Sequence, residues 1–189
     1  MEDAEPSAAI ARLLDGCKYS EFEPLLRMKS TKQSPLHHPE GSVWNHTMLV
    51  VDEAARVREQ SKNPRAFLWA ALLHDIGKPT TTRIRRGKIT SYDHDKVGAK
   101  LTRQFLSTLT EDRTLIDEVC ALVRYHMQIL FVVNGLPFAD VRGMRAAADI
   151  EEVALLGLCD RLGRLHADRA KEKAAVSLFL KKCGVSQRV

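Results

Sequence analysis

The sequence feature that most constrains the fold is a histidine followed by an aspartate where an apolar segment ends. The segment runs through Leu72 and Leu73 directly into His74 and Asp75, and Gly77 follows two residues later. Polar groups next to a hydrophobic core need partners, because an unpaired buried polar group costs free energy. We therefore expect other parts of the chain to supply partners for this pair.

The composition is that of one globular domain. The chain has 189 residues, of which 44% are hydrophobic, and this length suffices for one well-buried core. The four cysteines are far apart and form no CxxC pair, so neither a zinc knuckle nor a disulfide framework is indicated. The acidic start lacks the features of a signal peptide, and no apolar stretch approaches the roughly 20 residues of a membrane span. We expect a cytoplasmic protein without membrane contact.

Apolar residues recur every three or four positions through most of the chain, a spacing typical of amphipathic helices. The segments with this spacing are about 6–16, 21–28, 42–60, 64–75, 93–105, 111–127, 141–148, 150–164 and 167–183. Residues 81–92 alternate β-branched and basic side chains around Arg86 and Gly87, which predicts a two-stranded hairpin. A loop is expected over 29–41 and a short apolar connection after Met127. The prediction is an all-α helical bundle with one small β-hairpin.

Several of these helices carry a histidine or an acid on their inward-facing side. The residues are His46, His74, His126 and Asp160 on four helices, His94 at the start of a fifth, and Asp75 beside His74. A single histidine on an apolar face is more often a hydrogen-bonded core residue than a ligand. If these faces share one core, however, nitrogen and oxygen ligands converge there, as a metal site in a helical bundle requires.

Imidazole combined with carboxylate favours a divalent transition metal such as Mn, Fe, Co, Ni or Zn, whereas Ca and Mg prefer oxygen ligands. Six side chains exceed what one tetrahedral ion needs, so we expect one or two ions. In the two-ion hypothesis Asp75 bridges them. His46, His74 and Asp160 then bind the first ion, and His94 and His126 bind the second.

Basic residues are concentrated directly after the His-Asp pair. Between Asp75 and Asp93 there is no acid, and the basic residues are Lys78, Arg83, Arg85, Arg86 and Lys88. Clustered basic residues dominate affinity for phosphates, so a hairpin that contacts phosphate is one interpretation and a merely solvated hairpin is the other. The net charge of +5 suits an anionic partner but is a weak indication alone.

The order of these residues resembles the HD superfamily of metal-dependent phosphohydrolases, named after the His-Asp pair. Longer motifs are similar to the HD domain of bacterial CCA-adding enzymes, the tRNA nucleotidyltransferases. The motifs are residues 38–47 (HPEGSVWNHT), 72–79 (LLHDIGKP), 94–99 (HDKVGA) and 122–127 (LVRYHM). The resemblance implies a single HD domain over residues 1–189, with a core at about 24–165 and short helical extensions at both ends.

The resemblance also implies an activity. Because no nucleotidyltransferase motif precedes the HD motifs, we expect hydrolysis rather than nucleotide addition. The expected substrates are phosphoesters of nucleotides or RNA ends, first 2′,3′-cyclic phosphodiesters and second phosphomonoesters such as 2′-phosphates. Some related dinuclear families have two successive histidines where this chain has Tyr125 and His126, which leaves the second ion open.

The expected roles follow from phosphate chemistry. Asp75 is expected to be a ligand that also orients the attacking water, and Lys78 to compensate the charge of the phosphate. Lys78 has a plainer interpretation as a lysine that interacts with a helix C-terminus. Arg164 faces either the pocket or the surface. The expected substrate-binding residues are Lys78, Arg83, Arg86, Lys88 and Arg164. His37, His38 and His166 are expected in loops or at the surface, with His38 nearest the mouth of the site.

Two alternatives belong to other classes of protein. One is a di-iron oxygenase, since some HD proteins resemble this site but cleave carbon bonds. The other is a non-catalytic RNA-binding module that uses the basic hairpin. In each case we expect neither recognition of a DNA sequence nor membrane binding, and no feature indicates a particular oligomeric state.

Overall fold

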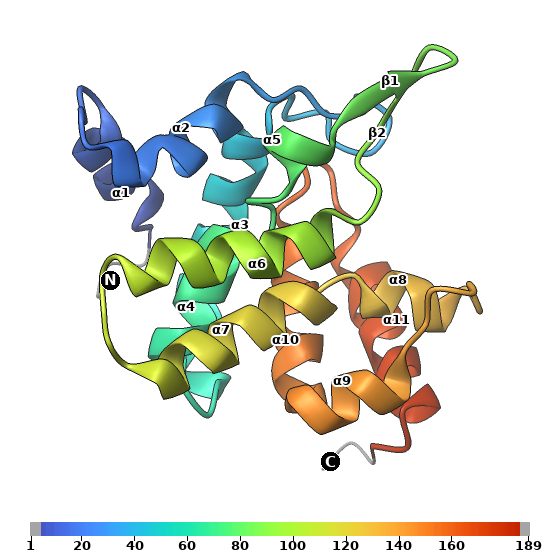
Figure 1. The fold of residues 1–189 in the computed structure, drawn as a ribbon. Coiled ribbons are helices and arrows are strands. Elements are labelled where there is room, and N and C mark those ends of the chain that lie inside the picture. The colour runs from blue at the N-terminus through green and yellow to red at the C-terminus, as the bar shows by residue number, and fades with distance from the viewer. Residues whose placement is uncertain (1–4, 186–189) are drawn as a thin grey trace.

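The computed structural model describes residues 5–185, and these residues form a helical bundle from which one hairpin projects (Figure 1). The helices are α1 (Ser7–Leu14), α2 (Glu23–Ser30), α3 (Val43–Val57), α4 (Pro64–Leu73), α5 (Lys78–Thr81), α6 (His94–Ser107), α7 (Arg113–Tyr125), α8 (Gln128–Val133), α9 (Val141–Ala147), α10 (Ile150–Leu162) and α11 (Arg169–Lys182). Short 3-10 turns, η1 (Ser20–Phe22) and η2 (Arg58–Gln60), precede α2 and follow α3. The predicted all-α fold with one small hairpin is confirmed.

The helix starts are set by side chains that cap them. Ser42 accepts a hydrogen bond from the Asn45 amide, Asn63 from Ala66 and Asp112 from Leu115, each at 3.0–3.2 Å. Such a cap satisfies one of the free N–H groups in the first helical turn. The three helices that begin here, α3, α4 and α7, all carry candidate ligands.

Helix α4 lies at the centre of the bundle, where it packs against α3, α7 and α10. Its buried residues are Ala66, Phe67, Leu68, Ala70, Ala71, Leu72 and Leu73, so almost every side is apolar. A helix that is hydrophobic all round is a buried one. The chain therefore carries the polar residues that follow α4 into the interior.

Two short helices depart from the sequence prediction. The segment after Met127 forms α8 rather than an irregular connection, because Ile129 and Val132, three positions apart, both face the core. Lys78 begins α5, a single helical turn in which Pro79 occupies the first turn, where no N–H is required. The connection after Met127 is apolar as predicted but forms a helix, and Pro79 lies in a helical turn of its own.

The hairpin consists of β1 (Arg83–Arg85) and β2 (Lys88–Thr90), with Ile84 opposite Ile89 in an antiparallel register. The turn residues Arg86 and Gly87 have φ values of 48° and 74°. Positive φ at both positions is the pattern of the two-residue turns that match the twist of paired strands. Figure 1 shows the hairpin standing away from the bundle between α5 and α6.

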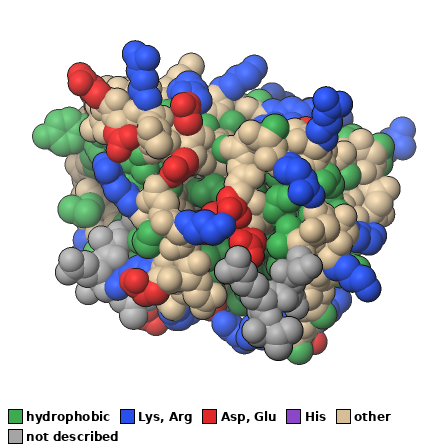
Figure 2. Space-filling view, turned by 90° about the horizontal axis from the view of Figure 1, so that it is seen from below, with side chains coloured by type: hydrophobic (Ala, Val, Ile, Leu, Met, Phe, Trp, Pro, Cys, Tyr) green, Lys and Arg blue, Asp and Glu red, His purple; other side chains and the backbone are tan. Residues whose placement is uncertain are grey.

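The face opposite the hairpin is shown in Figure 2. Acidic and basic side chains are mixed there with apolar ones, and no described histidine is visible on it. Within residues 5–185, no helix combines the length and apolar character needed to cross a membrane.

Candidate metal centre

The centre is built around the end of α4. His74 is the C-cap residue of this helix, and Asp75 lies in the turn that follows. Their exposed fractions are 0% and 1%. The partners expected for His74 and Asp75 come from four other helices.

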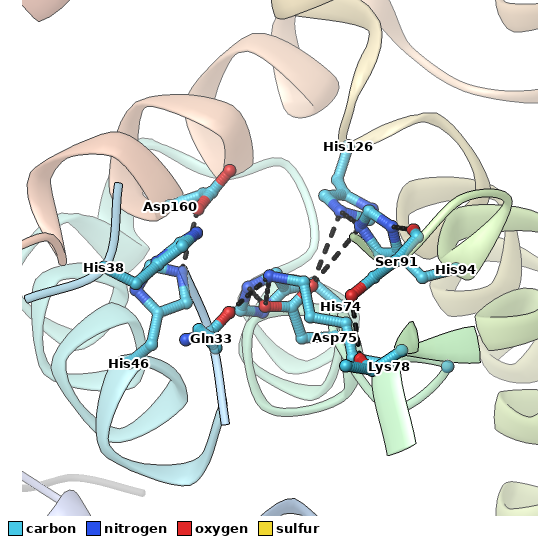
Figure 3. A network of polar contacts seen from close by, with 12 residues as sticks. Gln33, His38, His46, His74, Asp75, Lys78, Ser91, His94, His126 and Asp160 are labelled. Atoms are coloured by element: carbon cyan, nitrogen blue, oxygen red, sulfur yellow. Dashed lines mark hydrogen bonds and ion pairs between the residues drawn. The ribbon is translucent and has the colours of Figure 1, made fainter. Parts of the chain in front are cut away.

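The structure brings all six predicted ligands together (Figure 3). His46 comes from α3, His94 from the first residue of α6, His126 from the C-cap of α7 and Asp160 from α10. None of the six is more than 7% exposed. Figure 3 shows His94 and His126 on one side of Asp75, and His46 and Asp160 on the other.

Three of the histidines share one hydrogen-bonding pattern. Nδ1–H of His74, His94 and His126 donates to the backbone carbonyl three residues earlier, at 2.7–2.8 Å; these carbonyls belong to Ala71, Ser91 and Val123. A carbonyl oxygen only accepts, so each ring carries a proton on Nδ1, and in the neutral form of the ring Nε2 has a free lone pair. Metal-binding histidines are commonly oriented in this way by their second nitrogen.

On one side of Asp75, Nε2 of His94 lies 3.2 Å from Nε2 of His126 and 3.5 Å from Asp75 Oδ1. Burial lowers the pKa of His126 to about 3, and burial also lowers the pKa of His94, so both rings are neutral near pH 7. Two unprotonated nitrogens that face each other repel. A cation between them removes this repulsion, and the ligand atoms of Asp75, His94 and His126 all lie within 4.8 Å of one another.

On the other side, Nε2 of His74 is 3.3 Å from Asp75 Oδ2 and has no hydrogen-bond partner among residues 5–185. His46, His74 and Asp75 form a second group within 4.8 Å. A buried nitrogen without a partner is costly, and a cation in this group would provide one. The residues present therefore fit two ions that share Asp75.

His46 lies between two carboxylates. Its Nε2 is 2.9 Å from Asp160 Oδ1, and its Nδ1 is 2.9 Å from Glu40 Oε1. Burial lowers the pKa of His46, but the contacts with Asp160 and Glu40 outweigh burial and raise it overall. Burial likewise raises the pKa of Asp160, yet the charge of Arg164 and the bond from His46 hold it well below its usual value.

Of the expected substrate-binding residues, two reach this centre. Lys78 Nζ lies 2.7 Å from Asp75 Oδ2 and donates to Gln33 Oε1 at 2.6 Å. Arg164 Nη2 lies 3.6 Å from Asp160 Oδ1, so this arginine faces the pocket. The three on the hairpin, Arg83, Arg86 and Lys88, are exposed to solvent.

Two buried residues of the centre, Gln33 and Glu40, were not among the predicted site residues; both lie in the loop before α3. His38 was expected near the mouth of the site, and its ring packs edge-on against His46 with 4.6 Å between ring centres. The signal that could have revealed Glu40 is the motif at residues 38–47, in which an acid stands six residues before His46.

Comparison with known proteins agrees with this geometry. The family model of the HD domain matches residues 43–165. The multifunctional CCA protein of Actinobacillus pleuropneumoniae serotype 5b is 33% identical over 108 residues, which are 57% of this chain and 25% of that protein. The A-adding tRNA nucleotidyltransferase of Deinococcus radiodurans is 43% identical over 103 residues, 53% of this chain and 21% of that enzyme.

A longer match is that to the multifunctional CCA protein of Methylococcus capsulatus, 29% identical over 170 residues, which are 87% of this chain and 34% of that protein. The chain thus spans about a fifth to a third of the length of these relatives. The family match covers more than half of the chain and includes every predicted ligand. The chain therefore belongs to the HD domain family, the domain of a superfamily of metal-dependent phosphohydrolases.

Proposed function

We propose that the chain hydrolyses phosphoesters of nucleotides or RNA ends, with 2′,3′-cyclic phosphodiesters as the first substrate class and phosphomonoesters, including 2′-phosphates, as the second. The observation that carries this proposal is the convergence of buried histidine nitrogens on Asp75, with the ammonium group of Lys78 on the same carboxylate. Histidine and carboxylate ligands next to a fixed cation suit the binding of a phosphate.

The proposed ligands divide into two sets around Asp75. Asp75, His94 and His126 would hold one ion, and His46, His74, Asp75 and Asp160 the other. The ligand types favour Mn, Ni, Co or Fe as the bound ion. When bound, such ions lower the pKa of a coordinated water and compensate negative charge on the phosphoryl oxygens.

Lys78 is proposed to bind the substrate phosphate. Asp75 and Gln33 each hold the ammonium group of Lys78 from one side, at 2.7 and 2.6 Å, so its position is fixed before the substrate arrives. An ammonium group has three N–H donors, which leaves one for a phosphoryl oxygen. A donor fixed in advance stabilises developing charge without reorganisation during the reaction.

Arg164 and the hairpin are proposed to bind the remainder of the substrate. Arg164 Nε is buried without a partner among the described residues, so it offers a donor beside Asp160. The hairpin is tied to the centre at its base, because Thr82 and Ser91 contact each other through their hydroxyls at 2.8 Å and the Ser91 carbonyl accepts from His94. Arg83, Arg86 and Lys88 would thus meet phosphates beyond the one at the ions.

The names of the relatives support nucleotides or RNA ends as the substrate class. One is a multifunctional CCA protein and another is an A-adding tRNA nucleotidyltransferase, and a part of each is similar to this chain. The chain spans only a part of those proteins, so their whole activity does not transfer to it.

Hydrolysis of 2′,3′-cyclic AMP and 2′-AMP by protein loaded with Mn²⁺, Ni²⁺ or Co²⁺ tests the proposal. We expect His74→Ala and Asp75→Ala to abolish hydrolysis, and His37→Ala, an exposed histidine in a loop, to leave it unchanged. Activity that persists after chelation, or that survives Asp75→Ala, contradicts the proposal. Consumption of O₂ with an organic substrate would favour an oxygenase instead.

A further inference from the structure

The carboxylate of Glu40 is buried. Its side chain is 2% exposed, although it belongs to a loop between α2 and α3. The loop is closed by backbone hydrogen bonds from Gln33 to the Gly41 carbonyl and from Val43 to the Thr31 carbonyl, at 3.0 and 2.9 Å. The Asn45 side chain also donates to the Glu40 carbonyl. The position of Glu40 is therefore fixed by the backbone.

One oxygen of this carboxylate serves two histidines. Glu40 Oε1 accepts a hydrogen bond from His38 Nδ1–H at 2.8 Å and lies 2.9 Å from His46 Nδ1, with the His46 ring tilted from the ideal hydrogen-bond direction. A carboxylate only accepts, so His38 carries a proton on Nδ1, and the 2.9 Å contact favours a proton on Nδ1 of His46 as well.

His46 needs this partner because of its position. His74 and His126 end their helices and His94 starts one, so a backbone carbonyl three residues earlier is free for each. His46 lies inside α3, where the carbonyls accept from the amides four residues later. A side chain from outside the helix has to take the place of the carbonyl.

We infer that Glu40 is a positioning residue which, through Oε1, holds His46 with its proton on Nδ1 so that Nε2 is directed at the metal centre. This inference rests on the proposed metal site. It differs from a third ion bound by His38, Glu40 and His46, whose ligand atoms also lie within 4.8 Å. A third ion would require His46 to bind metal through both nitrogens, since Nε2 already faces Asp160.

The affinity and stoichiometry of Mn²⁺ or Co²⁺ binding, measured by competition with a chelating dye, separate these cases. We expect Glu40→Gln and Glu40→Ala to weaken binding at the His46 ion by about 10- to 100-fold, the usual cost of removing an orienting partner of a ligand. We expect His38→Ala to leave both stoichiometry and affinity unchanged. Glu53→Gln is the matched control, because Glu53 is likewise a buried acid but lies in α3 and pairs with Arg169 and Arg56 instead of a histidine of the centre.

Two further measurements make the test decisive. Nitrogen-15 NMR of the zinc-loaded protein is expected to show His46 with a proton on Nδ1, and Glu40→Ala to lose the protection of that proton from exchange. Circular dichroism checks that each variant is folded. Unchanged metal affinity in a folded Glu40→Gln or Glu40→Ala variant overturns the inference, and so does a lost equivalent of metal in His38→Ala. A wild-type chain that binds no divalent ion overturns the proposed function as well.

Discussion

At the scale of single residues, the hydrogen bond on Nδ1 decides what each histidine of the centre offers. His74, His94 and His126 donate from Nδ1 to carbonyls, so the neutral form of each ring offers Nε2 to a metal. Lys78 is positioned in a comparable way, because Gln33 Oε1 accepts from its ammonium group at 2.6 Å. The buried partners of the functional groups thus determine protonation and direction, while the groups themselves supply the chemistry.

Replacing Gln33 tests this view of Lys78. Gln33→Met keeps the length of the side chain but removes the acceptor, which leaves Lys78 to pair with Asp75 alone. A hydrogen bond to a charged group contributes about 1.5–3 kcal/mol, so we expect kcat to fall about tenfold or more. Metal affinity should stay unchanged, because Gln33 contacts no predicted ligand. Steady-state kinetics and metal titration check both, and a variant with full kcat contradicts a role for Gln33.

The sequence predicted the ligands better than their supporting residues. His46, His126 and Asp160 stand at positions of helical periodicity that place them on the core side, and the structure buries all three. Gln33 and Glu40 lie in a loop without any period. Their burial depends on how the loop closes against α3 and α5, which spacing along the chain does not specify.

At the scale of elements, the approach of α4 and α6 brings Asp75 to His94. The turn after α4 passes so close to α6 that a Cβ atom on Gly77 would lie 2.1 Å from the His94 carbonyl oxygen and 2.7 Å from the Gly98 nitrogen. Both of these are backbone atoms, which cannot rotate away. The glycine at this position is therefore required by close packing, since its φ of −78° is open to any residue.

Gly77→Ala should force the turn and α6 apart. We expect the free energy of unfolding to fall by about 1–3 kcal/mol, the usual cost of overpacking, and binding of the ion at His94 to weaken. Gly98→Ala is the milder control, because the nearest atom to its Cβ would be in the Val123 side chain, at 3.3 Å, and the backbone atoms of Gly77 and His74 would lie at an ordinary contact distance of 3.5 and 3.7 Å. Urea denaturation and metal titration compare the two. Equal stability of the two variants would falsify the packing argument.

The hairpin is expected to act on long substrates only. Its basic side chains are exposed, and Arg85 lies over the Tyr92 ring at 5.3 Å. We expect a triple variant of Arg83, Arg86 and Lys88 to serine to raise KM for an oligonucleotide with a 2′,3′-cyclic end and to leave the kinetics of 2′,3′-cyclic AMP unchanged. Phosphate contacts beyond the reacting one act only on the longer substrate.

A triple variant of Lys171, Lys173 and Lys181 to serine controls for net charge, because it removes the same three positive charges and all three lysines are exposed on α11. If the hairpin variant affects the two substrates equally, the hairpin acts on the centre itself. If it affects neither, the hairpin is merely solvated.

The helices were predictable wherever they were long. Periodicity identified α3, α4, α6, α7 and α10, because each spans at least ten residues. Helices α5 and α8 span four and six residues, too few for a helical period to show. Their formation depends on contacts with the rest of the bundle.

At the scale of the whole molecule, the fold buries several groups that titrate differently once the chain unfolds. Burial lowers the pKa of His38 to about 4 and that of His126 to about 3, from an ordinary value of 6.5. Between pH 6.5 and 4 the unfolded chain therefore binds protons that the folded chain does not. His46, whose pKa is raised, is protonated in both states below pH 6.5 and adds nothing to this difference.

The metal-free protein should accordingly lose stability as the pH falls below 6.5. Above pH 6.5 the raised pKa of His46 acts in the opposite direction, because the folded chain keeps this proton longer than the unfolded chain, so this contribution to stability is lost as the pH rises through the folded pKa of His46. Each such proton changes the free energy of unfolding by about 1.4 kcal/mol per pH unit. His38 and His126 together make the unfolded chain bind two protons more than the folded chain, and this difference sets the slope of the free energy of unfolding against pH. His94, whose pKa is also lowered, adds to the slope. Urea denaturation in excess chelator at pH 7.5, 6.0 and 5.0 measures this slope. His38→Ala and His126→Ala should each make it shallower by about one proton, whereas stability that is constant from pH 7.5 to 5.0 would show that these histidines are not buried in their neutral form.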